Sequence, residues 1–165
     1  AMADGGSFLV ATISSAVQEV ANGPDWVKEK AAPNLRGKKN IIAWAKKYGV
    51  KVLLGTDAGT PHNLHGANAN EFKYLVEYGL DPMEALLAGT GYAAEALGLS
   101  KDLGTIEDGK IADLVVLGGN PLDDISAVTD KVLMVIKGGK IVFGGKEAVI
   151  PQLNDADQLI QVRRS

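Results

Sequence analysis

Residues 50–59 read VKVLLGTDAG, a short apolar run that ends abruptly in a carboxylate between two glycines. The density of valine and leucine predicts a strand buried on both faces, as strands of a parallel sheet are. An ionised side chain at the end of such a strand is seldom there for packing, because an unpaired buried carboxylate is costly. At the C-terminal end of a strand in an α/β barrel, Asp57 would lie where catalytic groups gather.

The segments on either side of this run alternate between strand and helix. Residues 7–13 predict a second buried strand, and Asn22-Gly23-Pro24 marks a break. An amphipathic pattern predicts helices over 34–48 and 67–78, on either side of the strand at 50–56. The apolar face of the first helix would comprise Ile41, Ile42, Trp44 and Ala45. The order strand, helix, strand, helix is typical of β/α barrel units.

The second half of the chain predicts further helices and a small β module. Asp81-Pro82-Met83-Glu84 has the pattern of a capping box, and Thr90 predicts the cap of a short helix that runs to Ala96. Beyond Leu99 we expect a strand at 112–117 and a hairpin of residues 131–137 and 140–143 around Gly138-Gly139. The last twenty residues suggest a terminal amphipathic helix.

Composition excludes several classes of protein. The 165 residues carry a net charge of −3 without a block of lysine or arginine, which argues against a nucleic-acid partner. No apolar stretch approaches the ~20 residues that span a bilayer, so we expect a soluble chain with no membrane partner. The first residues have no signal-peptide pattern, although a signal upstream of Ala1 and the compartment stay open. With no cysteine there is no disulfide, thiolate metal site or cysteine nucleophile.

Asp57 is the leading candidate for chemistry. Aspartate is an oxygen ligand for zinc and other divalent ions, and it can take a proton from a water molecule. The flanking glycines, Gly55 and Gly59, let the backbone turn sharply and leave room for a substrate. An aspartate that caps the next helix or forms an Asx turn is an equally common reading of this pentapeptide.

Two histidines and a glutamate follow Asp57. His62 and His65 have the spacing of a pair of metal ligands, but histidines in loops more often bond to the backbone or face solvent. Because His65 lies just downstream of Asp57, substrate contact is our interpretation for it, and a neutral imidazole suits donation to a carbonyl or carboxylate. Glu71 starts a helix and could orient a histidine, although we favour a solvated position for it.

Several segments in a fixed order resemble the metal-dependent amidohydrolase superfamily, and the prolidase and imidazolonepropionase-like branch in particular. They are LGTDAG at 54–59, His65-Gly66, Glu71, GLDPMEAL at 79–86, LGTIEDGKIADLVVL at 103–117, NPL at 120–122 and VIKGGKIV at 135–142. Each segment alone is weak, whereas the combination and order are specific. The resemblance covers roughly residues 1–143 and leaves the tail unmatched.

The resemblance implies an α/β fold: the C-terminal part of a metal-dependent hydrolase TIM-like (β/α)8 barrel plus strands of a small composite β-sandwich. Residues 1–99 would be the last β/α units of the barrel, 100–145 the C-terminal part of the sandwich, and 146–165 a helical tail. Asp57 matches the aspartate that ends the eighth strand of the family's barrel, where it is a metal ligand and general base. Gly59, His62 and His65 would contact the substrate.

The sequence also departs from the family's pattern. The family's metal centre holds one or two ions on a His-x-His pair, a lysine or glutamate, two further histidines and the aspartate. This chain has no His-x-His and no histidine before position 62. Since zinc normally takes three or four ligands, we expect the divalent metal, zinc by resemblance, to belong to the complete enzyme, and this chain alone to bind none and to be inactive.

Two functions remain open at this point. In the first, the chain is the C-terminal segment of an amidohydrolase that hydrolyses C–N bonds of amide or peptide-like substrates, Xaa-Pro or other dipeptides among them, by metal-activated water. In the second, it is a non-catalytic truncated module that self-associates or pairs with a missing N-terminal half. Two strands cannot close a barrel and leave edges to be covered, so we expect a homo-oligomer or association with that missing part.

Overall fold

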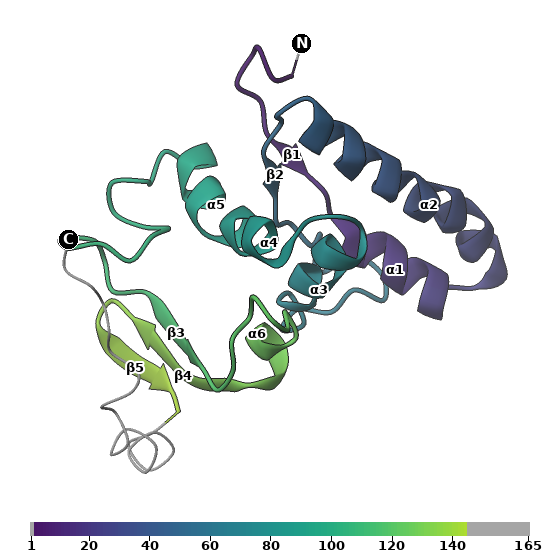
Figure 1. Ribbon diagram of the computed structural model, residues 1–165. Helices are drawn as coiled ribbons and strands as arrows, with labels where there is room; N and C mark the ends of the chain where they lie inside the picture. The colour runs from purple at the N-terminus through teal and green to yellow at the C-terminus, as the bar shows by residue number, and fades with distance from the viewer. Residues whose placement is uncertain (1, 145–165) are drawn as a thin grey trace.

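The computed structural model describes residues 2–144, which form a mixed α/β fold with two separate small sheets. The first sheet pairs β1 (Leu9–Val10) with β2 (Val52–Leu53) in parallel, with Leu9 opposite Val52. The helices α1 (Ile13–Asn22) and α2 (Asp25–Lys47) form the crossover between them. Figure 1 shows α2 as the long helix beside this strand pair. Parallel strands need such a long connection, which an antiparallel hairpin does not.

Three helices follow β2. They are α3 (Asn70–Glu77), α4 (Pro82–Gly89) and α5 (Gly91–Ala96), and α4 and α5 both contact β2. The second sheet is antiparallel and comprises β3 (Leu114–Leu117), β4 (Val132–Lys137) and β5 (Lys140–Phe143), with α6 (Ala127–Asp130) between β3 and β4. In Figure 1 this second sheet lies apart from the β1–β2 pair, on the other side of α4 and α5.

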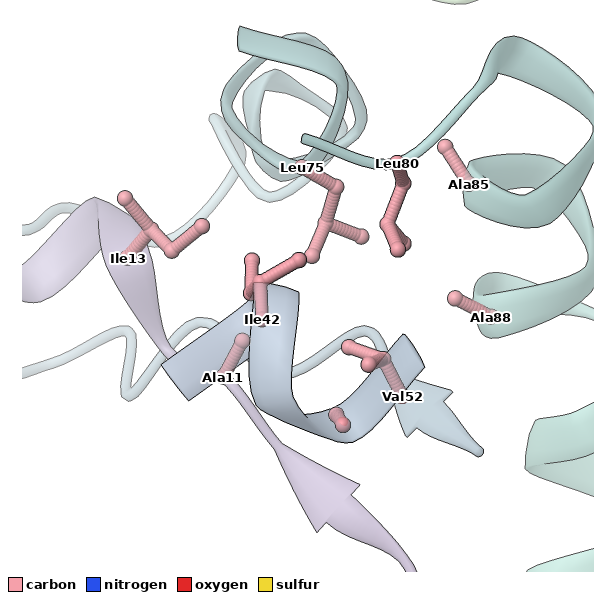
Figure 2. Packing of buried hydrophobic residues seen from close by; sticks show 9 residues of the cluster. Ala11, Ile13, Ile42, Val52, Leu75, Leu80, Ala85 and Ala88 are labelled. Atoms are coloured by element: carbon pink, nitrogen blue, oxygen red, sulfur yellow. The ribbon is translucent and has the colours of Figure 1, made fainter. Parts of the chain in front are cut away.

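The core lies where α1, α2, α3 and α4 meet the strand pair. Figure 2 shows Ile42 of α2 and Leu75 of α3 pointing toward each other at the centre of a cluster of aliphatic side chains. Small residues let the helices approach closely around this pair, among them Ala85 and Ala88 of α4, which are fully buried. The other members of the buried cluster are Ala11, Ile13, Ala45, Val52 and Leu80.

The predictions for residues 67–143 agree with this structure within a few residues. The capping box at the start of α4 is complete: the Glu84 backbone N–H donates to Asp81 Oδ1 over 2.8 Å, and the Asp81 N–H donates to Glu84 Oε2 over 2.9 Å. The hairpin is β4 and β5, with Lys137 opposite Lys140. The predicted terminal helix lies outside the described residues.

The predictions for the first fifty residues are partly wrong. Helix α1 begins where we expected the end of a strand, so the buried strand predicted at 7–13 is only Leu9–Val10, and Val10 is exposed. The strand predicted at 50–56 is likewise only Val52–Leu53, although both residues are buried as expected. Helix α2 begins nine residues before the predicted start and continues through Pro33. A proline inside a helix removes one hydrogen bond and crowds the carbonyl of the preceding turn, a cost that the burial of Ala31, Ile42 and Ala45 offsets.

Two side-chain predictions in the helices are also wrong. Ile41 and Trp44 were expected in the core, but 39 % and 61 % of their surface is exposed, because Ile42 and Ala45 face the strands instead. Thr90 occupies the N-cap position of α5 without a side-chain cap. Its hydroxyl donates to the Leu86 carbonyl over 2.7 Å, because Thr90 is also the last residue of the turn that ends α4.

Gly104 packs closely against α5 and has φ +94°. A Cβ at this position would lie 2.5 Å from the Ala94 Cβ. We expect Gly104→Ala to lower the free energy of unfolding by about 2–4 kcal/mol, since left-handed strain adds to overpacking. Gly109→Ala is the matched control, because Gly109 has φ +88° with nothing within 4 Å, and it should lose only about 1–2 kcal/mol. Equal losses for the two variants in urea unfolding would exclude the packing contribution.

Candidate functional site

Asp57 lies beyond the C-terminal end of β2, at the edge of the sheet where β1 also ends. Its backbone is left-handed, with φ 50°, a conformation that aspartate tolerates better than most side chains. The Asp57 carbonyl accepts the Thr60 backbone N–H over 3.2 Å and the Thr60 hydroxyl over 2.9 Å, and these bonds close a tight turn. The turn directs the exposed Asp57 side chain away from the core.

Neither common structural role of such an aspartate holds here. The next helix, α3, begins thirteen residues later with Ala69 at its N-cap, so Asp57 does not cap it. An Asx turn would use the Gly59 N–H, but that group donates to the Asn63 carbonyl over 2.7 Å instead of to the Asp57 carboxylate. Among residues 2–144 no hydrogen bond or ion pair is formed to this carboxylate. Its oxygens are therefore free to accept a proton or to bind a ligand.

The loop that follows Asp57 is ordered by Asn63, a residue that the sequence did not single out. Asn63 is buried, its side-chain amide donates to the Thr56 carbonyl over 2.5 Å, and its own carbonyl accepts the Gly59 N–H over 2.7 Å. These bonds fold residues 57–63 back onto the end of β2. An asparagine in a polar loop is common in sequences, and only the folded structure shows that Asn63 is buried and bonded to Thr56.

The structure brings His65 and Gly59 together. A Cβ added at Gly59, which has φ +99°, would lie 2.9 Å from His65 Nε2, so the imidazole packs directly over this glycine. Both histidines are exposed, and His62 has a left-handed backbone with φ 65°. In the part of the chain that the structure describes, no hydrogen bond joins either histidine to Asp57.

Glu71 is not solvated and does not orient a histidine, so both sequence-based readings of this residue are wrong. It is completely buried on the first turn of α3. Its Oε1 accepts the Ile13 N–H over 2.8 Å, and its Oε2 accepts the Ser14 N–H over 2.7 Å and also the Ser14 hydroxyl. Glu71 thus caps α1, a helix far away in sequence whose own N-cap residue, Thr12, provides no side-chain bond.

The burial of Glu71 predicts a pH dependence of stability. Desolvation raises the pKa of this carboxyl above its ordinary value, against the lowering effect of the bonds from Ser14 and Ile13. A raised folded-state pKa gives stability that is present at low pH and is lost as pH rises through that pKa. The stability of the wild type relative to Glu71→Gln should therefore fall as pH rises above about 4.5. Urea unfolding of both proteins across this range measures the difference, and a difference that grows with pH would contradict the prediction.

Metal-binding residues are too few in the described part of the chain to form a metal centre. Within residues 2–144 no three histidine, aspartate or glutamate side chains come together in a way that could hold an ion. Zinc sites normally use three or four ligands, and the site described above offers one free carboxylate. The residues present therefore do not fit a complete metal site. In the same range, no helix combines the length and apolarity needed to cross a membrane.

Comparison with known proteins shows the family to which the chain belongs. The sequence pattern of the Amidohydrolase family matches residues 9–142, so the chain is a member of the amidohydrolase family. This confirms the resemblance drawn from the sequence motifs. The chain matches only part of its relatives, about a third of the length of those that cover most of it.

Three relatives illustrate the similarity. The ochratoxinase of Aspergillus niger is 35 % identical over 153 residues, which are 87 % of this chain and 31 % of that protein. The imidazolonepropionase of Symbiobacterium thermophilum is 34 % identical over 91 residues, or 52 % of this chain and 19 % of that enzyme. A crystal structure of a Xaa-Pro dipeptidase with bound methionine in its active site superposes with a TM-score of 0.75 at 38 % identity, and the match covers 87 % of this chain and 36 % of the dipeptidase.

Proposed function

We propose that this chain forms the C-terminal third of a metal-dependent amidohydrolase that hydrolyses carbon–nitrogen bonds in amide or dipeptide substrates. The observation that carries the proposal is the free carboxylate of Asp57 at the end of a buried parallel strand. Membership of the amidohydrolase family supports it, and so does the similarity to a Xaa-Pro dipeptidase over most of the chain.

The architecture that goes with this function is a partial barrel with a partial sandwich. Residues 1–99 would supply the last two β/α units of a (β/α)8 barrel, with β1 and β2 as adjacent strands. Residues 100–145 would supply the C-terminal strands of a composite β-sandwich, and 146–165 a tail. The parallel pairing of β1 with β2 and the antiparallel sheet β3–β4–β5 are consistent with this division.

In the proposed reaction Asp57 is the general base. Its carboxylate takes a proton from the water that attacks the carbonyl carbon of the scissile bond. Asp57 then gives this proton to the leaving nitrogen, so that the C–N bond breaks with release of a neutral amine and Asp57 is again a carboxylate. His65 packs over Gly59, so its imidazole lies beside the turn that follows Asp57. There His65 can donate a hydrogen bond to the substrate's carbonyl or carboxylate. His62 and Gly59 would line the same side of the substrate.

A divalent metal, zinc in our proposal, would take Asp57 as one oxygen ligand. Its remaining ligands would come from residues outside this chain, because the described residues provide no further group of ligands around Asp57. One carboxylate holds zinc weakly. We therefore expect the chain by itself to bind no zinc at micromolar concentration and to hydrolyse no dipeptide, and equilibrium dialysis of the chain with zinc measures the first of these.

A chimera tests the proposed function. The third of the Xaa-Pro dipeptidase that this chain matches is replaced by residues 9–143 of this chain, and hydrolysis of Xaa-Pro and other dipeptides is measured with added zinc. We expect activity in the chimera and none in either part alone. A folded chimera that shows no hydrolysis of any amide or dipeptide substrate would overturn the proposal.

One observation favours a second candidate function, a module that associates with another copy or with a separate partner segment. An apolar groove of about 500 Å³ lies between the N-terminal residues, β1 and α2, and is lined by Leu9, Ile41, Trp44, Tyr48 and Val50 among others. Sedimentation velocity measures the association. Trp44→Ala should weaken it, whereas Trp26→Ala, which removes an equally exposed indole outside the groove, should not.

A further inference from the structure

Glu71 joins α3 to the corner between β1 and α1, which is distant from it in sequence. From α3 it reaches the corner between β1 and α1, where it accepts the backbone N–H groups of Ile13 and Ser14 and the Ser14 hydroxyl. On the other side of this corner, Lys38 of α2 donates to the Ala11 carbonyl over 2.6 Å. The attraction of the Lys38 ammonium also acts on Glu71. The end of β1 is therefore fixed by charged groups from two helices.

The corner that Glu71 fixes is strained. Thr12 has φ 45° and ψ 52°, the left-handed region, which is an outlier for a β-branched residue. Such a residue costs about 1–3 kcal/mol and persists only where the surrounding contacts hold it. The bonds from Ile13 and Ser14 to Glu71 lie directly after Thr12 and provide that hold.

The strained corner lies against the approach to Asp57. A Cβ at Gly55 would lie 2.3 Å from Val10 Cγ1 and 3.4 Å from Thr12 Cγ2, so the Gly55 backbone lies against both side chains. Only one residue, Thr56, lies between Gly55 and Asp57 in the chain. A shift of Thr12 would therefore change where the Asp57 turn begins.

Glu71 also holds the far end of the Asp57 loop. This loop comprises residues 57–69. Its first half is bonded to the end of β2 through Asn63 and Thr56, and it ends at the first turn of α3, where Glu71 lies. The same carboxylate thus fixes the end of the loop and the corner beneath its start. Glu71 therefore ties the end of this loop to the corner beneath its start, while Asn63 orders the turn between them.

We propose that Glu71 is a positioning residue of the candidate site, which holds Asp57 and His65 in place through the β1–α1 corner and the start of α3. This inference rests on the proposed function for its catalytic meaning. The structural part of the inference is that the conformation of loop 57–69 depends on Glu71, and this part does not depend on any catalytic activity. The two parts can therefore be tested separately.

Amide hydrogen exchange on the full chain at pH 7 tests the structural part. In Glu71→Gln one acceptor oxygen becomes an NH₂ donor that faces the Ser14 N–H. We expect the Gly59 and Asn63 amides, which are bonded within the loop, to exchange at least about tenfold faster than in the wild type. Amides of β4 serve as the internal reference. Glu77→Gln, an exposed change at the end of the same helix, is the matched control and should leave all these rates unchanged.

The milder variant Ser14→Ala removes only the hydroxyl bond among the three hydrogen bonds that Glu71 accepts. If Glu71→Gln fails to fold, the exchange experiment is done on Ser14→Ala instead. Faster exchange confined to Ile13 and Ser14, with loop 57–69 unchanged, would overturn the proposal and leave Glu71 as a helix cap only. In the chimera, Glu71→Gln should lower kcat about 10–100-fold well below its melting temperature. An inactive wild-type chimera would refute the proposed function, while the exchange rates would still decide the role of Glu71.

Discussion

Asp57→Asn should lower kcat of the chimera by about 10²–10⁴-fold, the range typical for loss of a general base. Asparagine has nearly the same shape and tolerates the same left-handed backbone, but it cannot accept the proton of the attacking water. It is also a poorer oxygen ligand for a divalent ion, because its side chain is neutral. Steady-state hydrolysis of a dipeptide at saturating substrate measures the effect.

The structure predicts that this loss is chemical and not a loss of folding. The exposed Asp57 carboxylate makes no hydrogen bond within residues 2–144, so its replacement removes no contact that stabilises the turn. Thermal unfolding of Asp57→Asn should match the wild type. Asp108→Asn, a change in an exposed turn of the β module, is the control and should keep full activity. Equal activity of the two variants would remove Asp57 from the mechanism.

Leu75→Ala should have the largest effect on stability, a loss of about 2–5 kcal/mol in the free energy of unfolding. Leu75 has no exposed surface and lies at the centre of the cluster, against Ile42 of α2 (Figure 2). Its removal leaves a cavity between α2 and α3 that the small alanines of α4 cannot fill. Urea unfolding followed by circular dichroism measures the loss.

Leu97→Ala provides the comparison for this prediction. Leu97 has 72 % of its surface exposed, so its truncation should change the free energy of unfolding by no more than about 0.5 kcal/mol. A loss for Leu75→Ala as small as that for Leu97→Ala would mean that the cluster around Ile42 is not the core of the folded chain.

The sequence predicted best those elements whose signals are local. The capping box at Asp81 and Glu84 closes within four residues, so its residues alone determine the start of α4. The glycine pair at 138–139 determines the β4–β5 turn in the same way, because few other residues accept a positive φ. The position of Asp57 after a buried apolar strand also followed from a run of ten residues.

The predictions from the sequence were wrong where packing between distant segments overrides the local preferences of the residues. The amphipathic pattern predicted a helix only from residue 34, but buried side chains on both sides of Pro33 carry α2 through the proline. Thr12 at the N-cap of α1 provides no side-chain bond, and the cap comes instead from Glu71, more than fifty residues away. A sequence pattern of helical period cannot show which distant backbone groups a buried carboxylate will meet.

The sequence by itself therefore determined the family, the alternation of strands and helices in the second half, and the position of Asp57 just after a buried strand. These features depend on patterns among neighbouring residues, and each segment of the sequence contains the whole of its pattern. Only the tertiary structure decided that the Asp57 carboxylate is free, that His65 packs on Gly59 and that Glu71 is buried. Each of these depends on which segments meet in space, and that is fixed by the packing of the whole core.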